Sequence, residues 1–209
     1  MAAYGRPALR DLFDESPTPH IAHPPRTHHR DFYLATDGSY SGDGGGLGAV
    51  VETRDGTRVT RLSIPDPAPD NNVAEYRALH LGLDVLATRV PAGASVGLVL
   101  DHDDLAANVN AAVLAARDPT GRPVHSVDLP PRTGNHWRGI EARLAGLGAV
   151  RAAVLDGGEN PAHPLANAPD LYDHVNDRPA RCVLPECPAS TDSPEGVPPP
   201  SRADRHASD

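Results

Sequence analysis

The sequence contains no lysine, so all 19 of its basic side chains are arginines. Against 28 acidic residues these give a net charge of −9 at pH 7. This balance is unusual for a protein that binds a polyanion, because phosphate binding favours a basic surface. Two explanations fit this acidic, lysine-free composition. One is a GC-rich genome, which disfavours lysine codons, and the other is a high-salt cytoplasm in which an acidic surface stays solvated. We favour the halophilic interpretation.

Aromatic residues and long apolar runs are also scarce. With two Phe and one Trp, the core must be built mainly from Ala, Val and Leu. No stretch reaches the roughly 18 to 20 apolar residues that cross a membrane, and the first residues lack the apolar region of a signal peptide. We therefore expect a soluble, cytoplasmic protein without membrane association.

The two cysteines, Cys182 and Cys187, lie in the run CVLPEC. Their spacing is longer than that of a common zinc knuckle, and no second cysteine pair exists to complete four ligands. We expect free or incidentally paired thiols, although His174 is near enough in sequence to contribute to a metal site.

Composition divides the chain into three segments. Residues 1–30 form an arm rich in Pro and His, 31–175 carry regular apolar periodicity, and 176–209 form a Pro-, Asp- and Ser-rich tail. The tail is predicted to be disordered, because it cannot bury enough apolar surface to offset its ordering entropy. Leu9, Leu12 and Phe13 in the arm are either part of a loosely ordered segment, which we favour, or a helical turn that docks on the domain.

Within the middle segment, alternating and helical periodicities succeed one another. Strands are predicted at residues 31–36, 47–53, 57–64, 96–100 and 150–155, and helices at 71–86, 104–116, 136–147 and, in broken form, 162–172. Asn71 or Asn72 can cap the first of these helices. Asp103 and Asp104 are interpreted as caps of the second, so they are excluded as site residues, as are Asp43 and Asp84, which lack a strand-end context.

Three acidic residues occupy informative places in this pattern. Asp37 ends the first apolar run, Glu75 lies on an amphipathic helix, and Asp101 ends another apolar run. If the two strands are parallel neighbours, all three carboxylates converge at one end of the sheet. Such a cluster repels itself unless a cation binds it, and a hard divalent ion with oxygen ligands is the usual solution.

Four short motifs occur in a fixed order: Asp37-Gly38-Ser39, the Gly-rich hairpin 44–48, Asn71-Asn72-Val73-Ala74-Glu75, and Leu100-Asp101. Together they resemble the type 1 ribonuclease H family, from about residue 31 to residue 168. The acidic, lysine-free composition points to a haloarchaeal-type member. The resemblance implies a ribonuclease H-like α/β fold, with a five-stranded mixed sheet of three antiparallel and then two parallel strands, flanked by helices.

The resemblance also implies a function, an endoribonuclease that cleaves the RNA strand of RNA/DNA hybrids with two Mg²⁺ or Mn²⁺ ions per site. In that scheme Asp37 bridges the two ions, Glu75 completes one ion and orients water or the 2′-hydroxyl, and Asp101 holds one ion.

The substrate contacts implied by the resemblance lie along the minor groove of the hybrid. They come from the backbone around Gly38 and Ser39 and from the side chains of Asn71 and Asn72. Asn can both donate and accept hydrogen bonds, and the 2′-hydroxyl distinguishes RNA from DNA.

The chain departs from the family at the fourth ligand, where the family places an Asp in an NxxADxLA-like run. The matching stretch, 160–166, is one residue shorter and has His163 in the Asp position. We interpret His163 as the fourth metal ligand, with Asp170 as the alternative. Imidazole supplies no negative charge and suits Mn²⁺ better than Mg²⁺. Some members of the family have a basic helical insertion that binds substrate, and residues 117–135 contain no such arginine-rich helix.

Two other functions remain open. One is a catalytically weak ribonuclease H-like module that only binds nucleic acid or a protein. The other is a nuclease that cleaves DNA on the same fold. We expect a monomer whose partner is the RNA/DNA hybrid, with no stable protein partner.

Overall fold

The computed structural model describes residues 6–22, 28–42, 44–118, 120 and 125–176. The predictions for residues 177–209, including those for Cys182 and Cys187, lie outside this range. In the part of the chain that is described, no helix combines the length and the apolar character needed to span a membrane.

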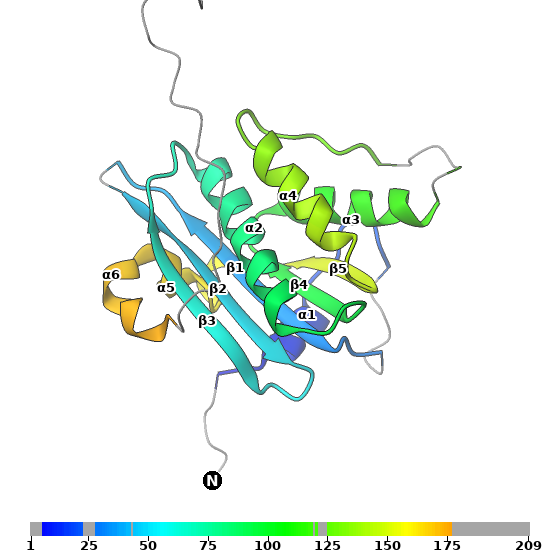
Figure 1. Cartoon of the computed structure of the whole chain (residues 1–209), viewed down its shortest axis with the longest axis horizontal. Helices are drawn as coiled ribbons and strands as arrows, with labels where there is room; N and C mark the ends of the chain where they lie inside the picture. Colours follow the sequence, from blue (N-terminus) through cyan, green and yellow to red (C-terminus); the bar gives the residue numbers. More distant parts are fainter. Residues whose placement is uncertain (1–5, 23–27, 43, 119, 121–124, 177–209) are drawn as a thin grey trace, which may run out of the picture.

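One mixed sheet organises the molecule (Figure 1). Its strand order is β3-β2-β1-β4-β5; β1 pairs antiparallel with β2, β2 antiparallel with β3, and β4 parallel with both β1 and β5. The strands are β1 (Phe32–Ser39), β2 (Gly45–Thr53), β3 (Arg58–Asp66), β4 (Ser95–Leu100) and β5 (Ala149–Val154). The predicted α/β class, with three antiparallel strands followed by two parallel ones, is confirmed.

The helices follow the predicted order, with one addition at the N-terminus. They are α1 (Leu9–Glu15), α2 (Asn71–Arg89), α3 (Asp103–Arg117), α4 (Gly134–Leu144), α5 (His163–Asn167) and α6 (Pro169–Tyr172), with 3₁₀ turns η1 (Gly157–Glu159) and η2 (Asp173–Val175). The break predicted in the last helical stretch falls at Ala168, which is non-helical at φ −138° and ψ 56°. Pro169 follows it, and proline disfavours helical backbone in the residue before it.

Alternate strand residues build two cores on opposite faces of the sheet. Leu34 and Leu98 pack with the larger core, to which α2, α3 and α4 contribute. Tyr33, Ala35 and Val99 point to the other face, where α1 and α5 pack. Two covered faces explain why strands β1 and β2 are buried at almost every position.

Helix α1 closes the second face. Leu9 is 0% exposed and Phe13 1%, and the Phe13 ring lies edge-on to Tyr33 with centroids 5.6 Å apart. The Leu9 amide donates to Glu52 Oε2 at 2.8 Å. Of the two alternatives for this apolar patch, the structure therefore shows the docked helix and not the loosely ordered segment. The division into arm, domain and tail stays a prediction.

Two helix caps differ from those predicted. Asp70, not Asn71 or Asn72, caps α2, because its Oδ1 accepts from the Val73 amide at 2.8 Å. His102 caps α3 through its ring, while Asp103 and Asp104 lie in the first turn. The Asn71 and Asn72 side chains are thus not used as caps.

A pair of buried histidines lies between α2 and α4. His80 is 7% exposed and His136 is 1% exposed, with ring centroids 5.9 Å apart. Burial lowers the pKa of both rings, and for His136, with the Arg77 and His80 charges adding to the effect, the pKa falls to about 4. The folded protein therefore keeps these rings neutral at a pH where the unfolded chain protonates them.

Because of this histidine pair, we expect the folded protein to lose stability at acidic pH. Because the unfolded chain binds a proton near pH 6.5 and folded His136 only near pH 4, the stabilisation is complete above pH 6.5 and is lost as the pH falls toward 4. We expect His136→Phe to reduce the drop in unfolding free energy between pH 7.5 and 4.5 by about 1–3 kcal/mol. Urea unfolding at both pH values measures this, with exposed His28→Gln as the control. Equal pH dependence in His136→Phe and wild type would contradict it.

Candidate active site

Strand register sets Asp37 beside Asp101. In the parallel pair of β1 and β4, Ala35 is aligned with Val99. Asp37 and Asp101 each follow two residues later, so they lie at the same level and on the same face of the sheet. Asp37 is buried and Asp101 half-buried. The predicted convergence at the strand ends is therefore a direct result of this pairing.

Close packing between β1 and α2 brings Glu75 to the same place. A Cβ on Gly38 would lie 2.2 Å from the backbone carbonyl carbon of Ala74, so only glycine fits there. The Gly38 amide donates to the Glu75 carboxylate, which is buried. Gly38, which was predicted as a substrate contact, thus has a structural role: it lets the start of α2 approach the first strand.

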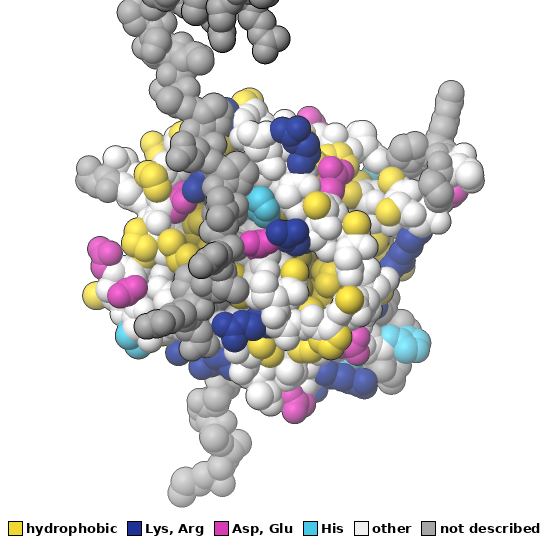
Figure 2. Space-filling model, viewed as in Figure 1, with side chains coloured by type: hydrophobic (Ala, Val, Ile, Leu, Met, Phe, Trp, Pro, Cys, Tyr) yellow, Lys and Arg dark blue, Asp and Glu magenta, His cyan; other side chains and the backbone are white. Residues whose placement is uncertain are grey.

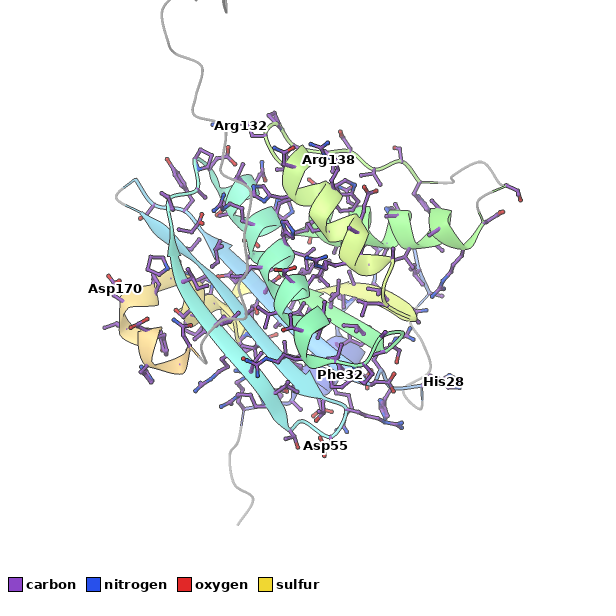
Figure 3. All side chains as sticks on the ribbon, in the orientation of Figure 1. His28, Phe32, Asp55, Arg132, Arg138 and Asp170 are labelled. Atoms are coloured by element: carbon purple, nitrogen blue, oxygen red, sulfur yellow. The ribbon has the colours of Figure 1, made fainter. Side chains whose placement is uncertain are left out.

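The fourth predicted residue, His163, comes from α5. Its Nδ1 lies 3.3 Å from Asp37 Oδ2. Ligand atoms of Asp37, Asp101 and His163 all lie within 4.8 Å of one another, which makes these residues a possible metal-binding group among the described residues. Asp170, the alternative, lies exposed on α6 and outside this group (Figure 3).

Asn160 positions α5, and sequence analysis did not assign it this role. It is 2% exposed, its Nδ2 donates to the Thr36 carbonyl at 2.9 Å, and its Oδ1 accepts from the Ala162 amide at 3.0 Å. The residue before Asp37 is thereby tied to the residue before His163. The only available signal was an Asn at the start of the run that contains His163.

Mutual repulsion and burial dominate the electrostatics of the site. Burial, followed by contact with Asp101, raises the pKa of Asp37 to about 8. Burial, followed by the charges of Asp101 and Asp37, raises the pKa of Glu75 to about 10. These carboxylates lose protons readily only if a cation offsets their charge.

The donor atoms fit a divalent cation. Asp37 Oδ2 and Asp101 Oδ1 are buried oxygens without a hydrogen-bond partner, which is costly unless another ligand occupies them. At 3.3 Å, the His163 contact with Asp37 is an ion pair only when the imidazole is protonated. Carboxylate oxygens suit Mg²⁺ and Mn²⁺, and the added imidazole nitrogen favours Mn²⁺ of the two.

The predicted substrate-contact residues lie next to this cluster. Ser39 ends β1, two residues after Asp37, and is half-buried. Asn71 and Asn72 are exposed in the first turn of α2, and Asn72 Oδ1 lies 2.9 Å from His102 Nε2. Ser39 therefore lies two residues from Asp37, and Asn71 and Asn72 lie four and three residues before Glu75 on the same helix.

Comparison with known proteins gives structural matches only. No family profile and no curated protein matches the sequence. LC11-RNase H1, isolated from compost and solved with an RNA/DNA hybrid, is 20% identical with a TM-score of 0.51; the match covers 65% of this chain and 93% of that one. The PFV RNase H domain is 19% identical with a TM-score of 0.50, over 67% and 94% of the two chains.

RNase H1 of Halobacterium salinarum is 21% identical with a TM-score of 0.49, over 68% of this chain and 98% of that one. At such identities the likeness concerns the fold. The chain has the ribonuclease H-like fold that the motifs predicted.

Cation binding should stabilise the protein. We expect Mn²⁺ at about 100 times its dissociation constant to raise the melting temperature by about 5 °C or more at pH 7.5, since a ligand of the folded state stabilises it by mass action. Asp37→Asn should remove most of this increase and Asp170→Asn should not. Thermal unfolding with and without Mn²⁺ measures the effect. An increase in Asp37→Asn as large as in wild type would exclude Asp37 as a ligand.

Proposed function

We propose that this protein is a divalent-metal-dependent endoribonuclease that hydrolyses the RNA strand of RNA/DNA hybrids. The observation that carries the proposal is the convergence of Asp37, Glu75, Asp101 and His163 at one end of the sheet. The ribonuclease H-like fold supports it, and the solved structure of LC11-RNase H1 contains such a hybrid.

Metal ions held by these residues would supply an activated water and neutralise charge on the phosphodiester oxygens. Asp37, which contacts both His163 and Asp101, is our candidate for the ligand shared by two ions. Asp101 would hold one of them. Glu75, fixed by the Gly38 amide, would complete one ion and orient water or the 2′-hydroxyl.

His163 has a different role from the three carboxylates. It is exposed, while Asp37 beside it is buried. An exposed imidazole can hold a metal ion or carry a proton between the site and solvent. We assign it as the fourth ligand at the rim of the site.

Away from the metal site, substrate recognition would rely on shape and on hydrogen bonds. The backbone of Gly38 and Ser39 and the side chains of Asn71 and Asn72 would follow the minor groove, where the 2′-hydroxyls lie. On the face formed by α2 and α4, arginine and acidic side chains are interspersed and do not form one basic patch (Figure 2).

One observation favours a second function. His163 stands where a carboxylate is expected, and a site with one fewer negative ligand would suit a catalytically weak module that binds nucleic acid. The same cleavage assay separates the two functions and also tests a DNA-cleaving nuclease.

We expect wild-type protein with Mn²⁺ to cleave the RNA strand of a labelled hybrid, and to leave duplex DNA and duplex RNA intact. Asp37→Asn should reduce the rate to less than about a tenth, because it removes a central ligand charge while keeping the side-chain shape. Asp170→Asn is the matched control and should keep wild-type activity. Cleavage of duplex DNA at a similar rate, or no cleavage at all, would instead support one of the alternatives.

Metal preference should depend on residue 163. Wild type is expected to be more active with Mn²⁺ than with Mg²⁺, and His163→Asp to match or exceed wild type with Mg²⁺, since a carboxylate is the harder ligand. His163→Ala should lose most of its activity with either ion. Initial rates across a metal titration provide the measurement. If His163→Ala cleaves like wild type and Asp170→Asn does not, Asp170 is the ligand.

A further inference from the structure

His102 joins the starts of helices α2 and α3 through a contact with Asn72, 30 residues before it in the sequence. Its Nδ1 accepts a hydrogen bond from the Leu105 amide at 3.2 Å, which caps α3. Its Nε2 lies 2.9 Å from Oδ1 of Asn72, in the first turn of α2. One ring therefore contacts the backbone of one helix and a side chain of the other.

The cap fixes the tautomer of the ring. A ring nitrogen that accepts an amide N–H carries no proton, so the neutral imidazole must carry its proton on Nε2. Nε2 therefore donates, and the atom of Asn72 that faces it has to be the amide oxygen. The opposite orientation of the amide would place two donors against each other.

This contact leaves the NH₂ group of Asn72 available for a ligand. Asn72 is exposed, and Asp70 already caps α2. The Asn72 side chain is thus not needed by its own helix. With its oxygen bound to His102, it presents donors outward.

The His102 ring is itself held in place. Tyr76, which is fully buried, meets it edge-on with centroids 6.4 Å apart and an interplanar angle of 85°. The Tyr76 hydroxyl accepts from Asn108 Nδ2 at 2.8 Å. Buried Asn108 also bonds the Asp128 backbone, donating to its carbonyl at 2.6 Å and accepting from its amide at 3.0 Å.

We propose that His102 is a positioning residue that holds the Asn72 amide with its NH₂ group toward the substrate, so that it donates to acceptors in the hybrid's minor groove. This proposal rests on the proposed function. The acceptors of matching chemistry are base N3 and O2 atoms and the 2′-hydroxyl oxygen. An amide already oriented in the free protein binds more tightly, because less rotational freedom is lost on binding.

The variant that tests this is His102→Asn. Asn is a good helix cap, so it can still accept from the Leu105 amide, but its side chain is too short to reach Asn72. With Mn²⁺ and labelled hybrid, we expect KM to rise about 3- to 10-fold while kcat stays within about 2-fold, which corresponds to one lost hydrogen bond in binding. The melting temperature should stay within about 2 °C of wild type, since the cap is kept.

Coupling with Asn72 separates positioning from a general structural effect. Asn72→Ala should raise KM at least as much as His102→Asn, and adding His102→Asn to Asn72→Ala should produce no further rise, because both remove the same donor. Multiplicative effects in the double variant, or an unchanged KM in His102→Asn, would overturn the proposal.

A measurement without substrate separates failure of this proposal from failure of the proposed function. ¹⁵N NMR of the free protein at pH 8 should show the proton of His102 on Nε2, and a Nδ1 proton would refute the positioning role whatever the enzyme cleaves. Absence of hybrid cleavage by wild type would instead refute the proposed function, and with it the substrate assigned to Asn72.

Discussion

The structure depends on holding two carboxylates, Asp37 and Asp101, against each other at the ends of neighbouring parallel strands. Burial raises the free energy of the charged form of Asp37, and the contact with Asp101 adds to this cost. The contact persists because the strands are fixed in register: Phe32 to Ala35 of β1 pair with Val96 to Val99 of β4, and apolar side chains cover both faces of the sheet. The free energy gained by burying these faces is what forces the two charges together.

Tight backbone contacts then place the other groups around this pair. Gly38 lets the start of α2 reach β1, and Gly48 does the same for α5, since a Cβ there would lie 2.4 Å from the Ala162 carbonyl oxygen. Asn160, just before α5, fixes this helix to β1 by donating a hydrogen bond to the Thr36 carbonyl. The glycines of the second motif, interpreted from sequence as a hairpin, therefore also serve as a packing surface for the helix that carries His163.

Strand positions and the three carboxylates were predictable from sequence because their signals are local. An apolar run that ends in Asp37 or Asp101 needs no knowledge of the rest of the chain. The caps were not predictable in this way, since Asp70 and His102 act through backbone geometry that neighbouring Asn and Asp residues could equally have adopted. The sequence analysis favoured a loosely ordered segment over the docked helix α1. Seven residues carry too little apolar surface to indicate a docking site, and their partners lie far away in sequence, on β1 and β2.

The charge of the site offers a reason why an acidic chain without lysine could bind a nucleic acid. Under the proposed function, three ionised carboxylates carry a charge of −3, and two divalent ions add +4. A fourth carboxylate would cancel this local excess, whereas the imidazole of His163 supplies a ligand atom without a negative charge and leaves the site net positive. A phosphodiester bound at the partly buried site interacts more strongly with the charges there than with acidic surface groups more than a Debye length away, because salt screens those distant groups. The attraction for a phosphodiester would then reside in the metal-loaded site itself, and the surface could remain acidic without preventing binding.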